Sequence, residues 1–191
     1  MSSGIRLRTD RLLLRPYRVT DVDDLLAIRC DPGAVRYRNW GMPDRVQVED
    51  AVRTRMVMDR LVSPGDCLVL AAEVRGRVVG DVSLEWVSAE HAQGQISFAF
   101  HSDVHGRGYA SEAAGAVLDL AFDHVQLHRV SGSCDARNTV SAALMRRLGM
   151  RQEAHFVHSE AVGGDWGDEL VFAVLEDEWR SRRRVNAPPP S

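Results

Sequence analysis

The sequence predicts a single-domain α/β fold in which helices flank a mixed sheet. Two strand-to-helix transitions support this interpretation. Residues 95–100 are strand-like and lead through a glycine-rich turn into a stretch whose apolar residues recur on one helical face. Residues 127–134 alternate like a strand, and the helix that follows them ends at Leu148-Gly149, where the glycine suits a left-handed position after the last turn.

The other elements are expected in an order that continues the alternation of helices and strands. Thr20 and Asp23 have the spacing of a capping box at the start of a helix. A tight turn at Arg75-Gly-Arg77 joins two strands as a hairpin. The remaining expected elements are a strand at 11–16, helices at 20–29 and 44–61, hairpin strands at 68–74 and 78–86, and a closing hairpin of 153–159 and 169–176 around Gly163-Gly164.

The composition and length indicate a single domain large enough for an enzyme. The chain has 191 residues, of which 45% are hydrophobic, which suffices for one substantial core. Residues 1–180 are expected to form it, and residues 181–191, rich in Arg and Pro, are expected to be a disordered tail. No apolar run is long enough for a membrane span, and the beginning lacks a signal region, so we expect a cytoplasmic protein without a membrane partner. The formal charge of -3 gives no drive toward nucleic acid, and no specific nucleic-acid partner is expected.

The cysteines and histidines do not form a disulfide or metal pattern. Cys30, Cys67 and Cys134 are odd in number and far apart, which favours reduced thiols that serve as small packing residues. His155 and His158 are three positions apart, which on a regular strand places them on opposite faces. The sequence also lacks Cys-x-x-Cys and His-Glu-x-x-His patterns, so no metal is expected.

The turn from His105 to Glu112, read His-Gly-Arg-Gly-Tyr-Ala-Ser-Glu, is the strongest candidate for a ligand site. The first turn of a helix has unpaired backbone N–H groups and a partial positive charge, and glycines let a phosphate approach the backbone closely. The stretch therefore predicts a pyrophosphate-binding turn, with a plain helix-entry loop as the alternative.

Two better-known phosphate loops do not fit this turn. A P-loop requires Lys followed by Ser or Thr, and neither follows Gly108. The dinucleotide fingerprint requires a third glycine, but position 111 is Ser. The sequence also lacks the glycine-flanked serine elbow of a hydrolase.

Five motifs in this order resemble the GNAT acyltransferase superfamily, and within it the RimJ/RimL-like branch that acetylates protein N-termini and related amines. They are Arg8–Pro16, Asn138–Ser141, Leu148–Met150, Trp166–Asp168 and Leu175–Trp179. The resemblance spans most of the chain. It implies a GNAT-like fold with a mixed, mostly antiparallel central sheet flanked by helices, acetyl-CoA as the acyl donor, and direct transfer to an amine in a ternary complex without a metal.

The resemblance also assigns the donor site. Gly108 and Ala110 match the family's acyl-CoA loop, but His105 stands where the family has Gln or Arg. A neutral imidazole lacks the arginine charge, so we expect weaker or more pH-dependent CoA binding; the alternative is a solvent-facing loop histidine. The residues expected to contact acetyl-CoA are Phe98, Ala99, Phe100, His105, Gly106, Arg107, Gly108, Tyr109, Ala110, Ser111, Asn138 and Ser141.

Attack of an amine on a thioester requires a base, oxyanion stabilisation and an acid for the leaving thiolate. Ser141 matches the branch's hydroxyl near the CoA sulfur, or it is a serine that only satisfies backbone N–H groups at a helix start. The family's oxyanion donor is a backbone N–H within residues 98–100. Glu160 is the first candidate for the base and Glu85 the second, and either could instead be a solvated strand charge.

The acceptor site is expected between the early helices and the final hairpin, with Tyr37, Trp40 and Trp166 as candidate wall residues; the alternative is that these aromatics fill the core. The leading acceptor is a protein or peptide α-amine. A small amine such as an aminoglycoside or polyamine is the alternative substrate, and a CoA-binding module without catalysis is the alternative class. The sequence leaves a homodimer open.

Overall fold

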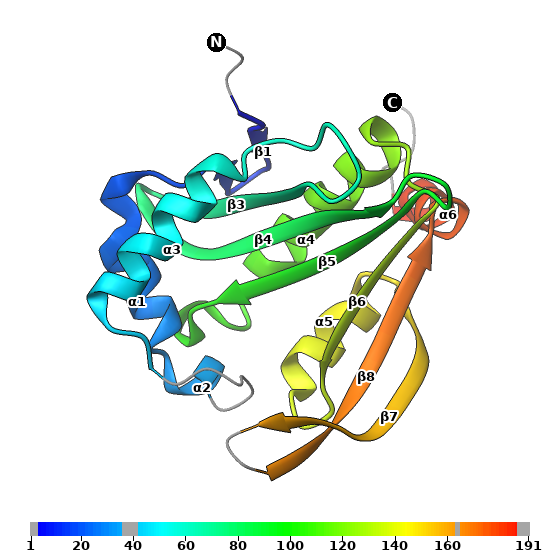
Figure 1. The fold of residues 1–191 in the computed structure, drawn as a ribbon. Helices are drawn as coiled ribbons and strands as arrows, with labels where there is room; N and C mark the ends of the chain where they lie inside the picture. The colour runs from blue at the N-terminus through cyan, green and yellow to red at the C-terminus, as the bar shows by residue number, and fades with distance from the viewer. Residues whose placement is uncertain (1–3, 36–41, 163–164, 187–191) are drawn as a thin grey trace.

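The structure, a computed structural model, describes residues 4–35, 42–162 and 165–186. Within these residues, eight strands form one sheet in the order β1-β2-β3-β4-β5-β6-β8-β7 (Figure 1). The strands are β1 (Leu7–Arg8), β2 (Leu13–Arg15), β3 (Cys67–Val74), β4 (Arg77–Ser88), β5 (Gln93–Phe100), β6 (Arg129–Asp135), β7 (Arg151–Val162) and β8 (Asp165–Leu175). The predicted α/β fold with a mixed, mostly antiparallel sheet is confirmed.

One pairing in the sheet differs from all the others. β5 and β6 are parallel, whereas the other neighbours are antiparallel. Their ladder holds only from Gln93↔Arg129 to Gln95↔Ser131, although β5 continues to Phe100 and β6 to Asp135. Beyond Gln95 the two strands separate, and Figure 1 shows β5 and β6 diverging toward their carboxyl ends. This separation divides the sheet into two wings.

The helices and short helical turns connect and cover these wings (Figure 1). They include capped and uncapped segments of very different length. They are η1 (Val19–Asp21), α1 (Val22–Arg29), α2 (Pro32–Val35), α3 (Arg45–Val57), η2 (Ser102–Val104), α4 (Tyr109–Asp119), η3 (Leu120–His124), α5 (Thr139–Arg147) and α6 (Glu176–Asn186). The helix expected over 44–61 is therefore shorter: Asp44 caps it with a reciprocal Gln47 contact, and it ends at Val57.

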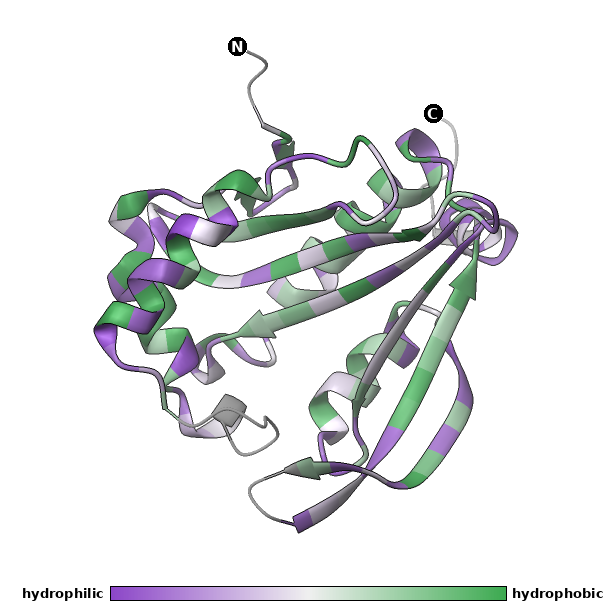
Figure 2. Cartoon of the chain, in the orientation of Figure 1, coloured by the Kyte–Doolittle hydropathy of each residue, from purple (hydrophilic) through white to green (hydrophobic). Residues whose placement is uncertain are grey.

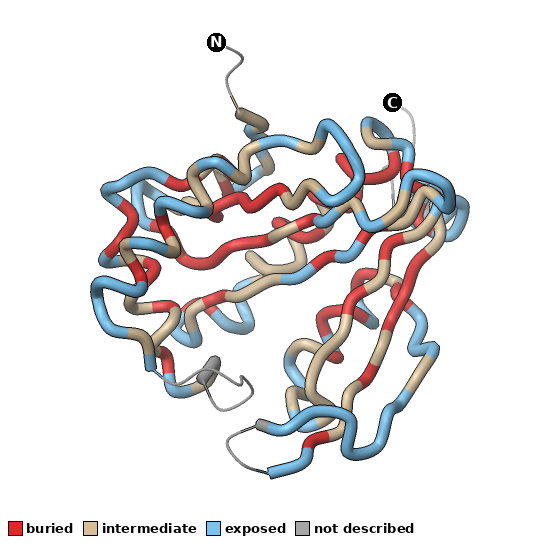
Figure 3. Tube along the Cα trace, in the orientation of Figure 1, coloured by how far each residue is buried: buried red, intermediate tan, exposed pale blue. Residues whose placement is uncertain are grey.

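The two faces of the sheet build separate hydrophobic clusters because side chains alternate along each strand. On one face, Leu70, Val82 and Ile96 pack with the apolar sides of α4 and α5. On the other face, Val69 and Ala71 pack with α1 and α3. Figure 2 shows hydrophobic residues along β3 and β8, and Figure 3 shows the buried centre of the sheet beside the exposed edge strand β7. The helices thus cover the sheet without closing the gap between its wings.

The expectation of a tail from residue 181 needs a correction. The α6 helix continues through residue 186, and Arg183 pairs with Asp119 at the end of α4 and with Asp123 of η3. Trp179 is buried and donates its indole N–H to Asp119 over 2.8 Å. Acidic residues of α4 and η3 thus hold the basic helix, a tertiary contact that the Arg-rich composition did not reveal. Residues 187–191 lie outside the described residues.

The start of α1 also differs from the expected capping box at Thr20. The helix begins at Val22, and Asp21 uses its carboxylate elsewhere. Arg15 donates to both Asp21 oxygens over 2.7 and 2.9 Å, and Arg18 N also donates to Asp21. Only 3% and 5% of the Arg15 and Asp21 side chains are exposed, so this is a buried ion pair. The pair joins β2 to α1.

Asp21→Ala is expected to lower the free energy of unfolding by about 3–5 kcal/mol, because it leaves the buried Arg15 guanidinium without this partner. The matched control is Asp50→Ala, whose pair with Arg53 has side chains 68% and 65% exposed and is expected to contribute less than about 1 kcal/mol. Urea unfolding monitored by circular dichroism measures both variants. Equal shifts of the two midpoints would contradict the assignment.

Candidate functional site

The turn before α4 has the backbone that an anion site requires. Gly106 and Gly108 have φ angles of 75° and 80°, in the left-handed region that favours glycine. Gly108 is the N-cap of α4 and contributes no side chain, so the amide groups of the first turn are not covered by a capping side chain. The helix presents its positive end to the space in front of the turn.

The second helix start, that of α5, lies at the same space. Asn138 caps α5 by accepting a hydrogen bond from Ser141 N over 3.0 Å. The cap uses the Ser141 backbone and the Asn138 side chain, so the Ser141 hydroxyl is not needed for it. At the far end, Arg147 donates to Ser111 Oγ of α4 over 3.3 Å, which ties the two helices together.

The separation of β5 from β6 exposes backbone groups of β5. His101 N donates to Val79 O, and hydrogen bonds to β4 recur at every second residue of an antiparallel pair. Phe98 and Phe100 are the intervening residues, so their N–H and C=O groups point away from β4, toward the β6 side. At Phe98 and Phe100, β6 is no longer paired with β5. The expected oxyanion donor therefore has an N–H group without a β6 ladder partner.

These features surround one cavity of about 770 Å³. Its lining comes from the end of β5, the glycine turn and the first turns of α4 and α5. The lining residues are Gly33, Phe98, Ala99, Phe100, Ser102, Val104, His105, Gly106, Gly108, Tyr109, Ala110, Ser111, Asn138, Thr139, Val140, Ser141, Ala143, Leu144 and Arg147. Every residue expected at the donor site is among them except Arg107, which is exposed and whose carbonyl accepts from Arg11.

The charge of the cavity suits an anion. Among its described lining residues there is no Asp or Glu, whereas Arg147 and His105 are basic types. His105 is exposed and lines the cavity, and its Nε2 lies 3.2 Å from Phe100 O at the end of β5. The departure from the family's Gln or Arg thus puts an imidazole at the cavity wall, and Arg147, which sequence reasoning missed, adds a guanidinium from α5.

Asp31 is a second residue that sequence reasoning missed. Its buried carboxylate accepts from Ser102 N and, over 2.8 Å, from Gly33 N, and both of these residues line the cavity. Burial by itself raises the pKa of Asp31, but the hydrogen bonds from Ser102 and Gly33 outweigh it and hold that pKa below its usual value. Asp31 therefore joins the start of α2 to the segment that leads into the glycine turn.

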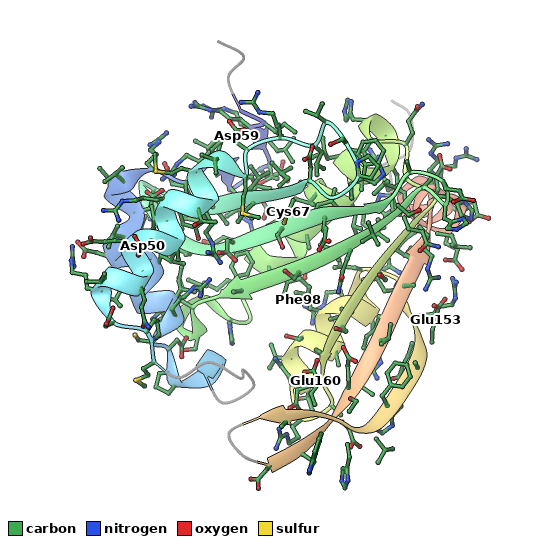
Figure 4. All side chains as sticks on the ribbon, in the orientation of Figure 1. Asp50, Asp59, Cys67, Phe98, Glu153 and Glu160 are labelled. Carbon is green, nitrogen blue, oxygen red and sulfur yellow. The ribbon has the colours of Figure 1, made fainter. Side chains whose placement is uncertain are left out.

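The two candidate bases lie apart from the cavity lining. Glu160 is exposed on β7, where it pairs with Gly167 of β8. Glu85 is exposed on β4 and pairs with Gln95, the last residue of β5 that is still paired with β6. Figure 4 shows Phe98 on β5 and Glu160 on the β7–β8 wing. The structure thus places one carboxylate on each wing and does not bring either into contact with Ser141 in the lining.

The pairing of β7 with β8 in the final hairpin is interrupted by an irregularity opposite Asp168. β7 has two residues more than β8 between the pairs Phe156↔Glu169 and Glu160↔Gly167, and His158 has a φ of 52°. Asp168 accepts from His158 N over 2.9 Å and lies 2.8 Å from His155 Nε2, so the backbone of one histidine and the ring of the other meet the same carboxylate. This bulge, in which three residues of β7 oppose one of β8, directly precedes Glu160.

The candidate acceptor aromatics are only partly described. Trp166 is 65% exposed at the outer end of β8, so it is not a core residue. Tyr37 and Trp40 lie outside the described residues. Of the three aromatics, the structure therefore shows Trp166 as a solvent-accessible side chain.

Among the described residues, no group of three or more His, Cys, Asp or Glu could hold a metal ion, and no helix is long and apolar enough to cross a membrane. Cys30, Cys67 and Cys134 are unpaired, as expected. Burial raises the pKa of Cys134 to about 11, which keeps it a protonated packing residue.

Known proteins share this architecture. The family model described as an acetyltransferase (GNAT) domain matches residues 11–151. The Bacillus subtilis protein YnaD, named an uncharacterized N-acetyltransferase, is 27% identical over an alignment of 184 residues that covers 92% of this chain and 99% of that protein.

Two solved structures extend the comparison. A GNAT-family acetyltransferase from Bacillus anthracis has a TM-score of 0.80 and 26% identity, with 91% of this chain and 99% of that chain covered. RimL, described as a ribosomal L7/L12 alpha-N-protein acetyltransferase in complex with coenzyme A, has a TM-score of 0.79 at 17% identity, with the same coverage. The family match spans the glycine turn, the separation of β5 from β6 and the start of α5, and the chain belongs to the GNAT acetyltransferase family.

Proposed function

We propose that the cavity at the divided sheet binds acetyl-CoA and that the acceptor is a protein or peptide α-amine. As a GNAT family member, the protein is an acyl-CoA-dependent N-acetyltransferase, and the proposal concerns its residues and its acceptor. The observation that carries the donor site is the left-handed glycine turn at the uncapped start of α4, opposite the unpaired edge of β5. The turn supplies N–H donors for phosphates, and β5 supplies ladder groups for an extended amide-containing chain.

The remaining lining residues fit the same donor. Phe98 and Leu144 give the cavity an apolar surface, while the Arg147 side chain reaches Ser111 in the first turn of α4 and His105 lies in the turn before that helix. Bound acetyl-CoA supplies an activated acetyl thioester. The chain must therefore orient the thioester carbonyl, accept a proton from the amine and return a proton to the thiolate.

Within this arrangement, each step has a candidate group. The Phe98 N–H, which points away from β4, is placed to donate to the carbonyl oxygen as it gains negative charge. The amine nitrogen forms the new C–N bond and loses its proton to a carboxylate, directly or through water. The C–S bond breaks, and the Ser141 hydroxyl donates a proton to the leaving sulfur. Because Asn138 caps α5 through the Ser141 backbone, this hydroxyl can take that role without weakening the cap.

Glu160 is our first candidate for the base and Glu85 the second. Gly167, the pairing partner of Glu160, packs against the segment that leads into α5: a Cβ at Gly167 would lie 3.2 Å from Asp135 Oδ2. This connects Glu160 to the helix that carries Ser141. Glu85 instead lies level with the point where β5 and β6 separate.

The surface beside the cavity favours a peptide acceptor over a polyamine or aminoglycoside. Ser83 and Ser97 form a 2.6 Å hydrogen bond on the open sheet face, and Glu85 and Gln95 are exposed next to them. Such a surface offers hydrogen-bonding groups to an extended chain.

Gly108→Val is expected to weaken CoA binding by about tenfold or more, because a β-branched residue is strained at φ 80° and its Cβ would lie 3.2 Å from Arg11 Nη2. Isothermal titration calorimetry with CoA measures the change. Gly76→Val, in the β3–β4 turn at φ 83°, is the control with the same backbone strain away from the cavity. Equal CoA affinity of Gly108→Val and Gly76→Val would show that the turn does not contribute to CoA binding.

Ser141→Ala is expected to lower kcat by about 10²-fold with little change in CoA affinity, because it removes a proton donor and keeps the backbone cap. Glu160→Gln and Glu85→Gln, assayed side by side, identify the base as the carboxylate whose loss reduces kcat. Full turnover in all three variants would contradict the catalytic assignments, whereas CoA binding by the unmodified protein without transfer to any acceptor would favour a CoA-binding module.

The acceptor is tested by incubating the protein with acetyl-CoA and a panel of peptides with varied N-termini, polyamines and aminoglycosides, followed by mass spectrometry. We expect acetyl groups on peptide α-amines, and tandem spectra distinguish these from lysine side chains. Acetylated products found only among the small amines would contradict the proposed peptide acceptor. They would not contradict the proposed donor site.

A further inference from the structure

The amino-terminal segment reaches across to the donor turn through a set of contacts that the mechanism above does not use. Arg11 Nη1 donates to Arg107 O over 2.8 Å, between the two left-handed glycines. The Arg11 guanidinium also lies over the Tyr109 ring, 4.8 Å from its centroid. Arg11 Nη2 is the group that a Cβ at Gly108 would meet at 3.2 Å. One side chain from the start of the chain thus touches successive residues of the turn.

The same segment surrounds the carboxylate of Glu112 in the first turn of α4. Thr9 Oγ1 and Arg11 N donate to Glu112 Oε1 over 2.5 and 2.9 Å, and Arg11 Nε donates to Oε2 over 2.7 Å. Burial alone would raise the pKa of Glu112, but these hydrogen bonds and the Arg11 charge hold it below its usual value. Glu112 is therefore an anion, paired with a cation that is itself half exposed.

An anion in this place creates an electrostatic problem for the proposed donor site. A carboxylate in the first turn of a helix interacts favourably with the helix dipole, but it competes with a phosphate for the same positive end. Ser111, the residue before Glu112, lines the cavity. Unless the Glu112 charge is neutralised, it repels a phosphate at the start of α4.

We propose that Arg11 is a positioning residue for the donor: its pair with Glu112 neutralises that carboxylate, and its bond to Arg107 O holds the glycine turn in its anion-binding form. The proposal rests on the proposed donor site. Arg11 acts through Glu112 and the turn, so its effect is on recognition of the donor phosphates. Arg11 does not act on the reacting thioester.

A purely structural tether would make a different prediction. If Arg11 only stabilised the fold, its loss would affect every donor equally and would lower the melting temperature in proportion. If it prepares the turn for phosphates, its loss affects acetyl-CoA but spares S-acetylpantetheine, a donor that has the thioester and lacks the phosphates. The two donors therefore separate positioning from general stability.

The experiment compares Arg11→Met, Arg11→Lys and Arg11→Met combined with Glu112→Gln. Calorimetry is expected to show that Arg11→Met binds CoA about tenfold more weakly than the unmodified protein. The double variant is expected to bind CoA at least about threefold more tightly than Arg11→Met, since Gln removes the charge and keeps Oε1 as an acceptor. Arg11→Lys keeps the charge and is expected to bind CoA more tightly than Arg11→Met. kcat/KM for S-acetylpantetheine is expected to stay within about twofold of the unmodified protein.

Arg8→Met is the matched control, because it removes one exposed arginine from the same segment at β1. It is expected to leave CoA affinity unchanged, and thermal melting reports whether each variant is folded. Equal losses with both donors, or a double variant that binds CoA no better than Arg11→Met, would overturn the proposal. An absence of CoA binding by the unmodified protein would instead overturn the donor site itself.

Discussion

The short parallel ladder between β5 and β6 is the constraint on which the site depends. After Gln95 the two strands diverge, so the carboxyl-terminal half of β5 has backbone groups without a β6 partner. The core on the α4 side holds the wings apart, because α4 packs on β4 and β5 while α5 packs on β6. A continuous sheet would pair Phe98 and Phe100 with β6 and leave no space for a substrate between the strands.

Two helix starts lie at this gap. The α4 start has no side-chain cap, and the α5 start is capped by Asn138. The described cavity lining includes Arg147 and His105 and no carboxylate, while the carboxylate of Glu112 lies nearby in the first turn of α4. Arg11 pairs with Glu112 from a segment about a hundred positions away in the chain. The glycine turn is thus part of a tertiary assembly in which the glycines are only one part.

Much of the site was predictable from local patterns. Gly108 was expected because an anion-binding turn requires a flexible backbone, and the structure gives it a left-handed φ. Asn138 was expected at the donor site from its motif, and in the structure it caps α5 beside the cavity. His105 was identified as a departure from the family loop, and it does line the cavity. These are all properties of a few consecutive residues.

Tertiary structure alone decided the contacts between distant segments. Asp31, Arg147 and Arg11 carry no motif that points to the donor turn, because each reaches it from another element. The same reason explains α6: the arginines after Trp179 look like a solvated tail until the acidic end of α4 is placed beside them. The sequence by itself determined most of the helices and strands and pointed to the family, since hydrophobic period and turn chemistry are local. Only the fold determined which charges neutralise one another, because that depends on distances in space.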